Sequence, residues 1–158
     1  KPYLEDYEDF HFNLSHSGSW VVCATSSKPV GIDVEKIREI DLKIAQRFFS
    51  KEEARDLFSK KDEEKIGYFF ELWTLKESYI KADGRGLSLP LNSFSFRIEN
   101  DNIIFMSENE SKNFFFKKYD VDTEYKIAVC SMESQFPEHV HIKSFKEVCK
   151  ILFTQSNS

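Results

Sequence analysis

The sequence predicts an α+β fold in which a small mixed or antiparallel sheet packs on one long helix. β-rich stretches occupy the beginning and the later part of the chain, and helical spacing is concentrated between them. Because strands and helices come in blocks and do not alternate, a doubly wound parallel sheet is not expected. The length of 158 residues, with 41% hydrophobic residues and 16 Phe, predicts that residues 1–158 form a single domain with a buried core.

The beginning of the chain is predicted as a loop followed by three short strands. Residues 1–10 are acidic and show no periodicity, so we expect an entering loop. The runs that follow are separated by Ser-Gly-Ser and Ser-Ser-Lys-Pro turns, which predicts a meander. The three predicted strands span residues 11–14, 20–25 and 30–35.

Helical spacing follows, and its strongest stretch is also the longest. The predicted helices span residues 41–49, 51–59 and 61–82. Ser50 and Glu53 form a candidate capping box for the second helix, because each side chain can bond the backbone amide of the other residue. The third helix is expected to end in "DGRGLSLP", since glycine supplies a helix stop and proline cannot continue a helix.

Four more β-rich or alternating runs complete the predicted sheet. They span residues 92–100, 102–108, 113–121 and 125–132. Residues 144–153 are amphipathic and predict a final helix, and residues 154–158 are expected to be a frayed tail.

Charge and cysteine content favour a reducing cytoplasm and exclude several partners. The formal net charge of -5 comes without a basic stripe, so nucleic acid is not expected as a partner. No apolar run is long enough for a membrane span, so no membrane association is expected. Three widely spaced cysteines do not suggest a disulfide framework. Cys23 and Cys130 lie in strand-like runs, where we expect buried structural thiols.

Two carboxylates in "VGIDVEK" are candidates for a metal site. Asp33 and Glu35 project from one face of the predicted strand because side chains alternate. Their mutual repulsion would be relieved by a cation such as Mg²⁺, which prefers oxygen ligands. A solvated acidic strand face is the alternative interpretation, and this motif alone favours it.

A carboxylate and an ammonium on the longest helix are a second candidate. Glu77 and Lys81 are four residues apart in "LWTLKESYIK", so they are neighbours on one helix face. An ordinary helix-stabilising pair, worth about 0.2–0.5 kcal/mol, is the alternative. The pair alone favours this alternative, but the apolar helix, the neighbouring Trp73 and the Gly-rich turn with Arg85 weaken it, and together they suggest a shared metal and phosphate site.

The stretch "NLSHSGS" is a third candidate. Ser15, His16 and Ser17 precede Gly18 in a predicted turn, where hydroxyl, imidazole and amide groups suit a phosphate. The nucleophile elbow of a hydrolase is absent, because no glycine precedes the central serine. An ordinary polar hairpin turn stays the alternative. For Glu53, the helix cap is favoured over a reach toward the metal site.

Together these motifs resemble a 4′-phosphopantetheinyl transferase of the Sfp type. The resemblance lies in "FNLSHSG", "VGIDVEK", "RFFSKEE", "FFELWTLKESYIKADGRGLSLPL" and "YKIAVC", in that order. It implies an enzyme that moves the phosphopantetheine arm of coenzyme A to a serine of an acyl or peptidyl carrier protein and releases adenosine 3′,5′-bisphosphate. Such enzymes activate synthetases of nonribosomal peptides, which includes antibiotic biosynthesis.

The resemblance also implies roles for individual residues. Magnesium ligands would be Asp33, Glu35 and Glu77, with Glu53 as a weaker candidate. Lys81 would lie near the pyrophosphate, and Glu77 or a metal-bound water would be the candidate base. The implied coenzyme A contacts are Lys1, Ser15, His16 and Lys81. The implied carrier-docking residues are Ile40, Lys43, Ile44, Arg47 and Phe48.

The resemblance covers the second half of the family's pseudodimer and the junction before it. This implies that a missing N-terminal half or a second copy of the chain would complete the cleft. A noncatalytic carrier-binding or coenzyme A-binding fragment is therefore an alternative function. A generic metal phosphoesterase would use the same carboxylates but would leave the docking segment unexplained.

Overall fold

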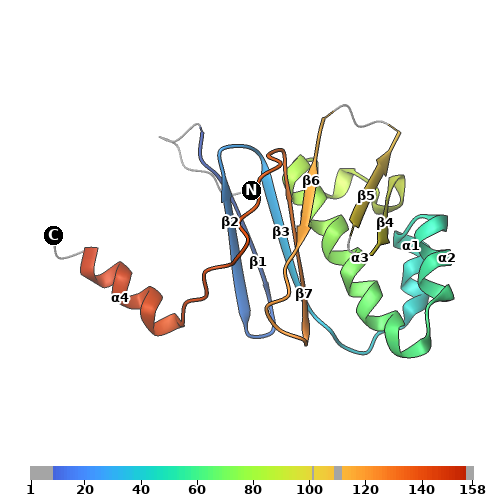
Figure 1. Ribbon diagram of the computed structural model, residues 1–158, viewed down its shortest axis with the longest axis horizontal. Coiled ribbons are helices and arrows are strands. Elements are labelled where there is room, and N and C mark those ends of the chain that lie inside the picture. The colour runs from blue at the N-terminus through green and yellow to red at the C-terminus, as the bar shows by residue number, and fades with distance from the viewer. Residues whose placement is uncertain (1–8, 101, 109–111, 156–158) are drawn as a thin grey trace.

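The computed structural model describes residues 9–100, 102–108 and 112–155, so Lys1 and nearly all of the predicted entering loop lie outside the described residues. Figure 1 shows a strand hairpin on one side, a long helix against a central sheet, and short helices on the other side. The strands are β1 (His11–Ser17), β2 (Trp20–Ser26), β3 (Val30–Lys36), β4 (Phe94–Glu99), β5 (Asn102–Ser107), β6 (Phe115–Lys118) and β7 (Tyr125–Ser131). The α-helices are α1 (Ala45–Phe48), α2 (Lys51–Ser59), α3 (Asp62–Asp83) and α4 (Phe145–Gln155).

The strands of the described residues form antiparallel sheets in the orders β1-β2, β3-β7-β6 and β4-β5. The predicted α+β class is confirmed, but the predicted meander is wrong. β3 does not pair with β2; it pairs with β7, so that Asp33 lies opposite Ala128. A pairing between segments this far apart in the sequence depends on the complete fold, which local turn signals do not report.

The long helix α3 lies directly against β3 and β7. A Cβ atom added to Gly31 would lie 2.0 Å from the carbonyl oxygen of Ser78. Small buried residues, Ala128 and Cys130, continue this face of the sheet on β7. The absence of a side chain at Gly31 therefore lets the acidic strand approach the helix.

The predicted boundaries of the helices are largely confirmed. α3 ends at Asp83 and is capped by Gly84, whose φ of 85° is favourable for glycine and whose amide donates to Ile80 O. The capping box of Ser50 and Glu53 is present at the start of α2. The predicted helix over residues 41–49 is instead a 3-10 turn, Leu42–Ile44, followed by the single turn of α1.

Aromatic side chains fill the core on both flanks of α3. Tyr79 packs edge-on against Phe94 and Phe114, with ring centroids 4.7 and 5.1 Å apart. Near the other end of the helix, Trp73 stacks on Phe69 at 5.7 Å. These contacts hold the β4-β5 hairpin and the short helices on α3, which fixes the helix face that carries Glu77 and Lys81.

Two further predictions need correction. Cys130 is buried as expected, but Cys23 is exposed, because alternation on β2 turns it away from β3. Thr154 and Gln155 belong to α4 and not to a frayed tail, while residues 156–158 lie outside the described residues. Within the described part of the chain, no helix is both long and apolar enough to cross a membrane.

Candidate active site between β3 and α3

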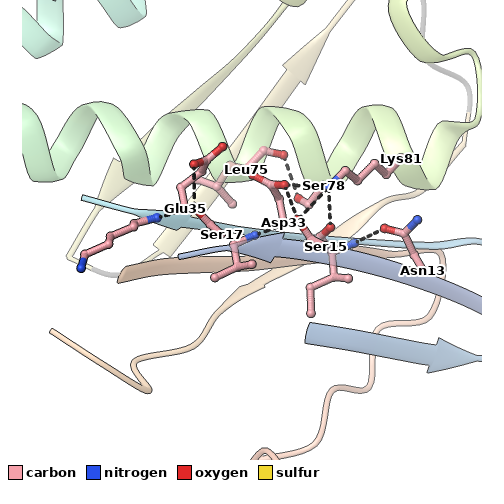
Figure 2. A network of polar contacts seen from close by, with 11 residues as sticks. Asn13, Ser15, Ser17, Asp33, Glu35, Leu75, Ser78 and Lys81 are labelled. Carbon is pink, nitrogen blue, oxygen red and sulfur yellow. Dashed lines mark hydrogen bonds and ion pairs between the residues drawn. The ribbon is translucent and has the colours of Figure 1, made fainter. Parts of the chain in front are cut away.

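The polar network between β1, β3 and α3 contains the predicted acidic residues of β3 (Figure 2). Asp33 and Glu35 come from β3 and Lys81 comes from α3, where Glu77 lies one turn before it. Strand alternation turns Ile32 and Val34 into an apolar cluster on the opposite face, so the carboxylates face the helix.

Asp33 is the most buried member of the site, with 4% of its surface exposed. Its Oδ1 atom accepts hydrogen bonds from Lys81 Nζ at 2.6 Å and from Ser15 Oγ at 2.9 Å. Burial raises the pKa of this carboxyl above its ordinary value, and the Lys81 ammonium opposes that increase. Among the described residues, Asp33 Oδ2 has no hydrogen-bond partner although it is buried.

Glu35 lies two residues further along the same strand face and is partly exposed. Ser17 Oγ donates a hydrogen bond to Glu35 Oε2 at 3.3 Å. Arg38 approaches the same oxygen to 3.6 Å from the solvent side. Burial raises the pKa of Glu35, and the negative charge of Asp33 raises it further.

Glu77, which lies on α3, is repelled by the two carboxylates of β3. Burial raises its pKa first, and the charges of Asp33 and Glu35 add to the increase, while Lys81 opposes it. Repulsion among the carboxylates thus raises the pKa values of Glu35 and Glu77, while burial alone raises that of Asp33.

These residues fit Mg²⁺ in donor chemistry, although they do not form a complete coordination sphere. Carboxylate oxygens are the ligands that this ion prefers. Asp33 Oδ2 is such an oxygen, and it is buried without a hydrogen-bond partner among the described residues. In the part of the chain that the structure describes, however, no three acidic, histidine or cysteine side chains lie close enough together to hold a metal. The Lys81 ammonium supplies the positive charge beside Asp33 in this arrangement.

The structure separates the two candidates for coenzyme A contacts on β1. Ser15 points into the site, where its hydroxyl also accepts from Lys81 Nζ at 3.1 Å. His16 is exposed, and strand alternation directs it to the opposite face of the hairpin. Lys1 lies outside the described residues.

Glu53 lies in the core and not at this site. Its carboxylate forms an ion pair with Lys76 Nζ at 2.7 Å, and both side chains have no exposed surface. It also accepts from the backbone amides of Ser50 and Phe96, each at 2.8 Å. The capping interpretation is therefore confirmed, and Glu53 also connects α2 to α3 and β4.

The predicted docking segment lines a groove that begins at the acidic strand. The groove has a volume of about 500 Å³. Of the predicted docking residues, Ile40, Lys43, Ile44 and Arg47 line it, and Phe48 instead packs edge-on against Trp73. The remaining lining residues are Glu35, Arg38, Asp41, Phe69, Phe70 and Trp73. Because Glu35 belongs to both features, the groove and the acidic site are continuous.

Two polar residues that are not among the implied site residues also contact this site region. Asn13 Oδ1 accepts from the amide of Ile32 at 2.9 Å, and Ser17 Oγ accepts from the amide of Lys36 at 3.0 Å. Their signal is the alternation Asn-x-Ser-x-Ser in β1, which places Asn13, Ser15 and Ser17 on one face.

The chain belongs to the 4′-phosphopantetheinyl transferase superfamily, whose family model matches residues 29–130. It is 48% identical over 149 residues to the 4′-phosphopantetheinyl transferase Sfp of Bacillus subtilis, covering 94% of this chain and 66% of that protein. The 4′-phosphopantetheinyl transferase psf-1 of Bacillus pumilus is 44% identical over 144 residues, covering 90% of this chain and 61% of that protein. The chain thus spans about two thirds of the length of these relatives.

A solved structure independently supports the fold. The holo-(acyl-carrier-protein) synthase of Bacillus anthracis, in complex with CoA (3′,5′-ADP), superposes with a TM-score of 0.58 at 18% sequence identity. The match covers 68% of this chain and 96% of that chain.

Proposed function

We propose that this chain transfers the 4′-phosphopantetheine arm of coenzyme A to a serine of an apo acyl or peptidyl carrier protein, releasing adenosine 3′,5′-bisphosphate. The observation that carries the proposal is the continuity between the acidic site and a groove lined by apolar and basic residues, in a chain of this superfamily. Phosphoryl transfer requires charge neutralisation and positioning, and these two features can provide both.

The proposed cofactor is Mg²⁺, held by Asp33, Glu35 and Glu77. Its chemistry is to neutralise charge on the diphosphate of coenzyme A. Asp33 offers Oδ2 for this purpose without breaking its hydrogen bonds through Oδ1. Glu35 and Glu77 would complete the ligand set by small side-chain movements, because both are less buried than Asp33.

Lys81 is proposed to bind the diphosphate. Its ammonium now contacts Asp33 Oδ1 and Ser15 Oγ, and it also donates to Ile32 O at 3.1 Å. Coenzyme A would offer it further anionic acceptors. Lys1, Ser15 and His16 are proposed as contacts around the nucleotide phosphates, with the Ser15 hydroxyl shared between the ligand and Asp33.

Glu77 is the proposed base for the carrier serine. Its carboxylate lies one turn before Lys81 on the helix face that meets the acidic strand, which places a proton acceptor beside the lysine proposed to bind the diphosphate. As the proton leaves the serine hydroxyl for Glu77, the serine oxygen bonds to the phosphorus that carries the pantetheine arm. The bond from that phosphorus to the bridging oxygen breaks, and the leaving group is adenosine 3′,5′-bisphosphate. Glu77 then releases the proton to solvent.

The groove suits a carrier helix that is apolar but flanked by acidic residues. Ile40 and Ile44 offer apolar surface, and Arg38, Lys43 and Arg47 surround it with positive charge. Opposite charges would orient the partner, while the apolar contacts would hold it. A carrier bound here would present its serine toward Glu35 and the acidic site. Such a partner, in turn, is consistent with a cytoplasmic role in nonribosomal peptide biosynthesis.

A noncatalytic fragment that binds coenzyme A or a carrier is the second candidate function. One observation favours it: no group of three acidic, histidine or cysteine side chains within residues 9–100, 102–108 and 112–155 lies close enough together to hold a metal. A further N-terminal half or a second copy would then complete the cleft.

The mass of an intact apo carrier protein distinguishes these functions. The carrier is incubated with this chain, coenzyme A and Mg²⁺, with an EDTA-treated sample beside it. A phosphopantetheine adduct that requires Mg²⁺ supports the transferase. Binding of coenzyme A without an adduct supports the fragment. Consumption of coenzyme A without a carrier would instead support a phosphoesterase.

A further inference from the structure

A row of polar side chains on β1 takes the place of a neighbouring strand along β3. The amide of Ile37 donates to Glu124 O on the β7 side, so the alternate amides of Ile32, Val34 and Lys36 face the other way. In the described residues these three amides donate to side-chain atoms of β1 and not to its backbone. Their acceptors are Asn13 Oδ1, Ser15 Oγ and Ser17 Oγ, and each contact joins residues 19 apart in the sequence.

The two serines in this row do more than accept from the backbone. Ser15 Oγ also donates to the carboxylate of Asp33, and Ser17 Oγ also donates to the carboxylate of Glu35. Each serine therefore joins a carboxylate to the amide of the residue that follows it. Figure 2 shows these side chains lying between β1 and β3, beneath α3.

The residue types in the row follow the needs of β3. Asn13 accepts from the amide of Ile32, which follows Gly31. Because glycine has no side chain, Asn13 has no carboxylate to bond at this position. A hydroxyl can donate and accept at the same time, and serine occupies the two positions where β3 also presents a carboxylate. This correspondence between Asn-x-Ser-x-Ser and Gly-x-Asp-x-Glu indicates a specific role for the hydroxyls.

We infer that Ser17 is a positioning residue that fixes the Glu35 carboxylate beside Asp33, ready to bind a divalent cation. The inference rests on the proposed metal site. Glu35 is more exposed than Asp33, and Arg38 draws the same oxygen toward solvent at 3.6 Å. The Ser17 hydroxyl is anchored by the Lys36 amide at 3.0 Å, so it offers Glu35 a fixed donor on the side of the site.

The test measures binding of Mn²⁺ to the 158-residue chain by electron paramagnetic resonance, without coenzyme A or a carrier. Ser17→Ala is expected to weaken Mn²⁺ binding about 10-fold, which is the lower end for a lost partner of a metal ligand. Exchange of the Lys36 amide should accelerate in the same variant. Ser17→Thr keeps the hydroxyl and should restore both. Ser19→Ala removes an exposed serine hydroxyl in the adjacent turn and is the matched control.

A double-mutant cycle separates positioning from general destabilisation. In a Glu35→Gln background, Ser17→Ala should have little further effect on Mn²⁺ binding, because its target carboxylate is already lost. An unchanged Mn²⁺ affinity in Ser17→Ala, or an equal loss in both backgrounds, would overturn the inference. Wild-type chain that binds Mn²⁺ but forms no carrier adduct would count against the proposed function and leave the inference standing.

Discussion

Gly31 on β3 lies against the backbone of Ser78 on α3, closer than any side chain would permit. A Cβ at this position would be 2.0 Å from Ser78 O and 2.5 Å from the amide nitrogen of Ala82. Both contacts are with helix backbone, which cannot rotate away. This close approach sets the distance between the two elements that carry Asp33 and Glu77, so fold and site depend on the same glycine.

Gly31→Ala is therefore expected to destabilise the protein and to move the helix away from the acidic strand. Overpacking of a close contact costs about 1–3 kcal/mol, and a clash with backbone should lie at the upper end. Denaturant unfolding measures the loss. Gly67→Ala on the same helix is the control, since a Cβ there meets nothing within 4 Å. It should stabilise the helix by about 0.5–1 kcal/mol; equal effects of the two variants would contradict this explanation.

Lys76→Met is expected to destabilise the fold strongly, because it leaves a buried carboxylate without its cation. Lys76 Nζ contacts Glu53 Oε2 at 2.7 Å and donates to Leu91 O and Phe94 O, each at 2.8 Å. Breaking a buried pair from one side costs about 3–5 kcal/mol. The free energy of unfolding, measured by urea titration, reports this loss.

Lys65→Met provides the comparison on the same helix. Lys65 forms an ion pair with Asp62, whose side chain is 94% exposed. Such surface pairs contribute about 0–1 kcal/mol, so the change should be small. Combining Lys76→Met with Glu53→Gln should recover part of the lost stability, since the unpaired buried charge is removed while the side-chain oxygen can still accept from the Phe96 amide. A double variant that is no better than Lys76→Met would contradict the buried-charge account.

Sequence patterns predicted the side-chain orientation along β3 better than they predicted the strands around it. Strand alternation predicted that Asp33 and Glu35 share one face, and in the structure they do, with that face toward α3. The same alternation directs Ser15 and His16 to opposite faces of β1. The sequence pattern predicts both residues in a turn and therefore does not separate them. The neighbours of β3 could not be predicted from local patterns. Along one edge of β3 the backbone amides bind side chains of β1, and along the other edge β3 pairs with β7, which is distant in the sequence.

The burial of Lys76 illustrates why the core was harder to predict. In the sequence, Lys76, Glu77 and Lys81 are all charged positions on one predicted helix. Nothing in this pattern shows that Lys76 is the buried one. Only the packing of α2 and β4 on α3 gives Lys76 its three oxygen partners, and burial there lowers its pKa to about 8. Glu53 likewise showed its capping role in the sequence but not its ion pair, because the partner lies on another helix.

Arg47→Glu is expected to weaken carrier binding while leaving turnover at saturating carrier nearly unchanged. Arg47 and Lys43 supply positive charge to the groove, and reversal of one charge would repel an acidic partner. The KM for the carrier should increase, with the largest difference from wild type at low salt. Lys146→Glu on α4, an exposed position outside the groove, is the matched control. Equal KM values for the two variants would argue against docking in the groove.

Glu77→Gln is expected to abolish adduct formation and, in the metal-free protein, to increase stability at neutral pH. Glu77 is the proposed base, and its charge also repels Asp33 and Glu35. Asp33, Glu35 and Glu77 all have pKa values raised above the ordinary 3.8 for Asp or 4.5 for Glu. At pH values between the ordinary and the raised pKa values, the folded state binds more protons than the unfolded state. The free energy of unfolding should therefore fall progressively as pH rises through this range.

The pH dependence provides a measurement that does not require activity. The difference in unfolding free energy between Glu77→Gln and wild type should be largest above the raised pKa values and should shrink as pH falls toward 4.5, because Glu77 then becomes neutral in the wild type too. If Mg²⁺ binds as proposed, it should narrow this difference in unfolding free energy at neutral pH, because it would neutralise the wild-type carboxylates. Thermal unfolding with EDTA and with Mg²⁺ reports both effects. If Glu77→Gln is less stable than wild type at neutral pH without metal, the explanation by charge repulsion in this cluster is wrong.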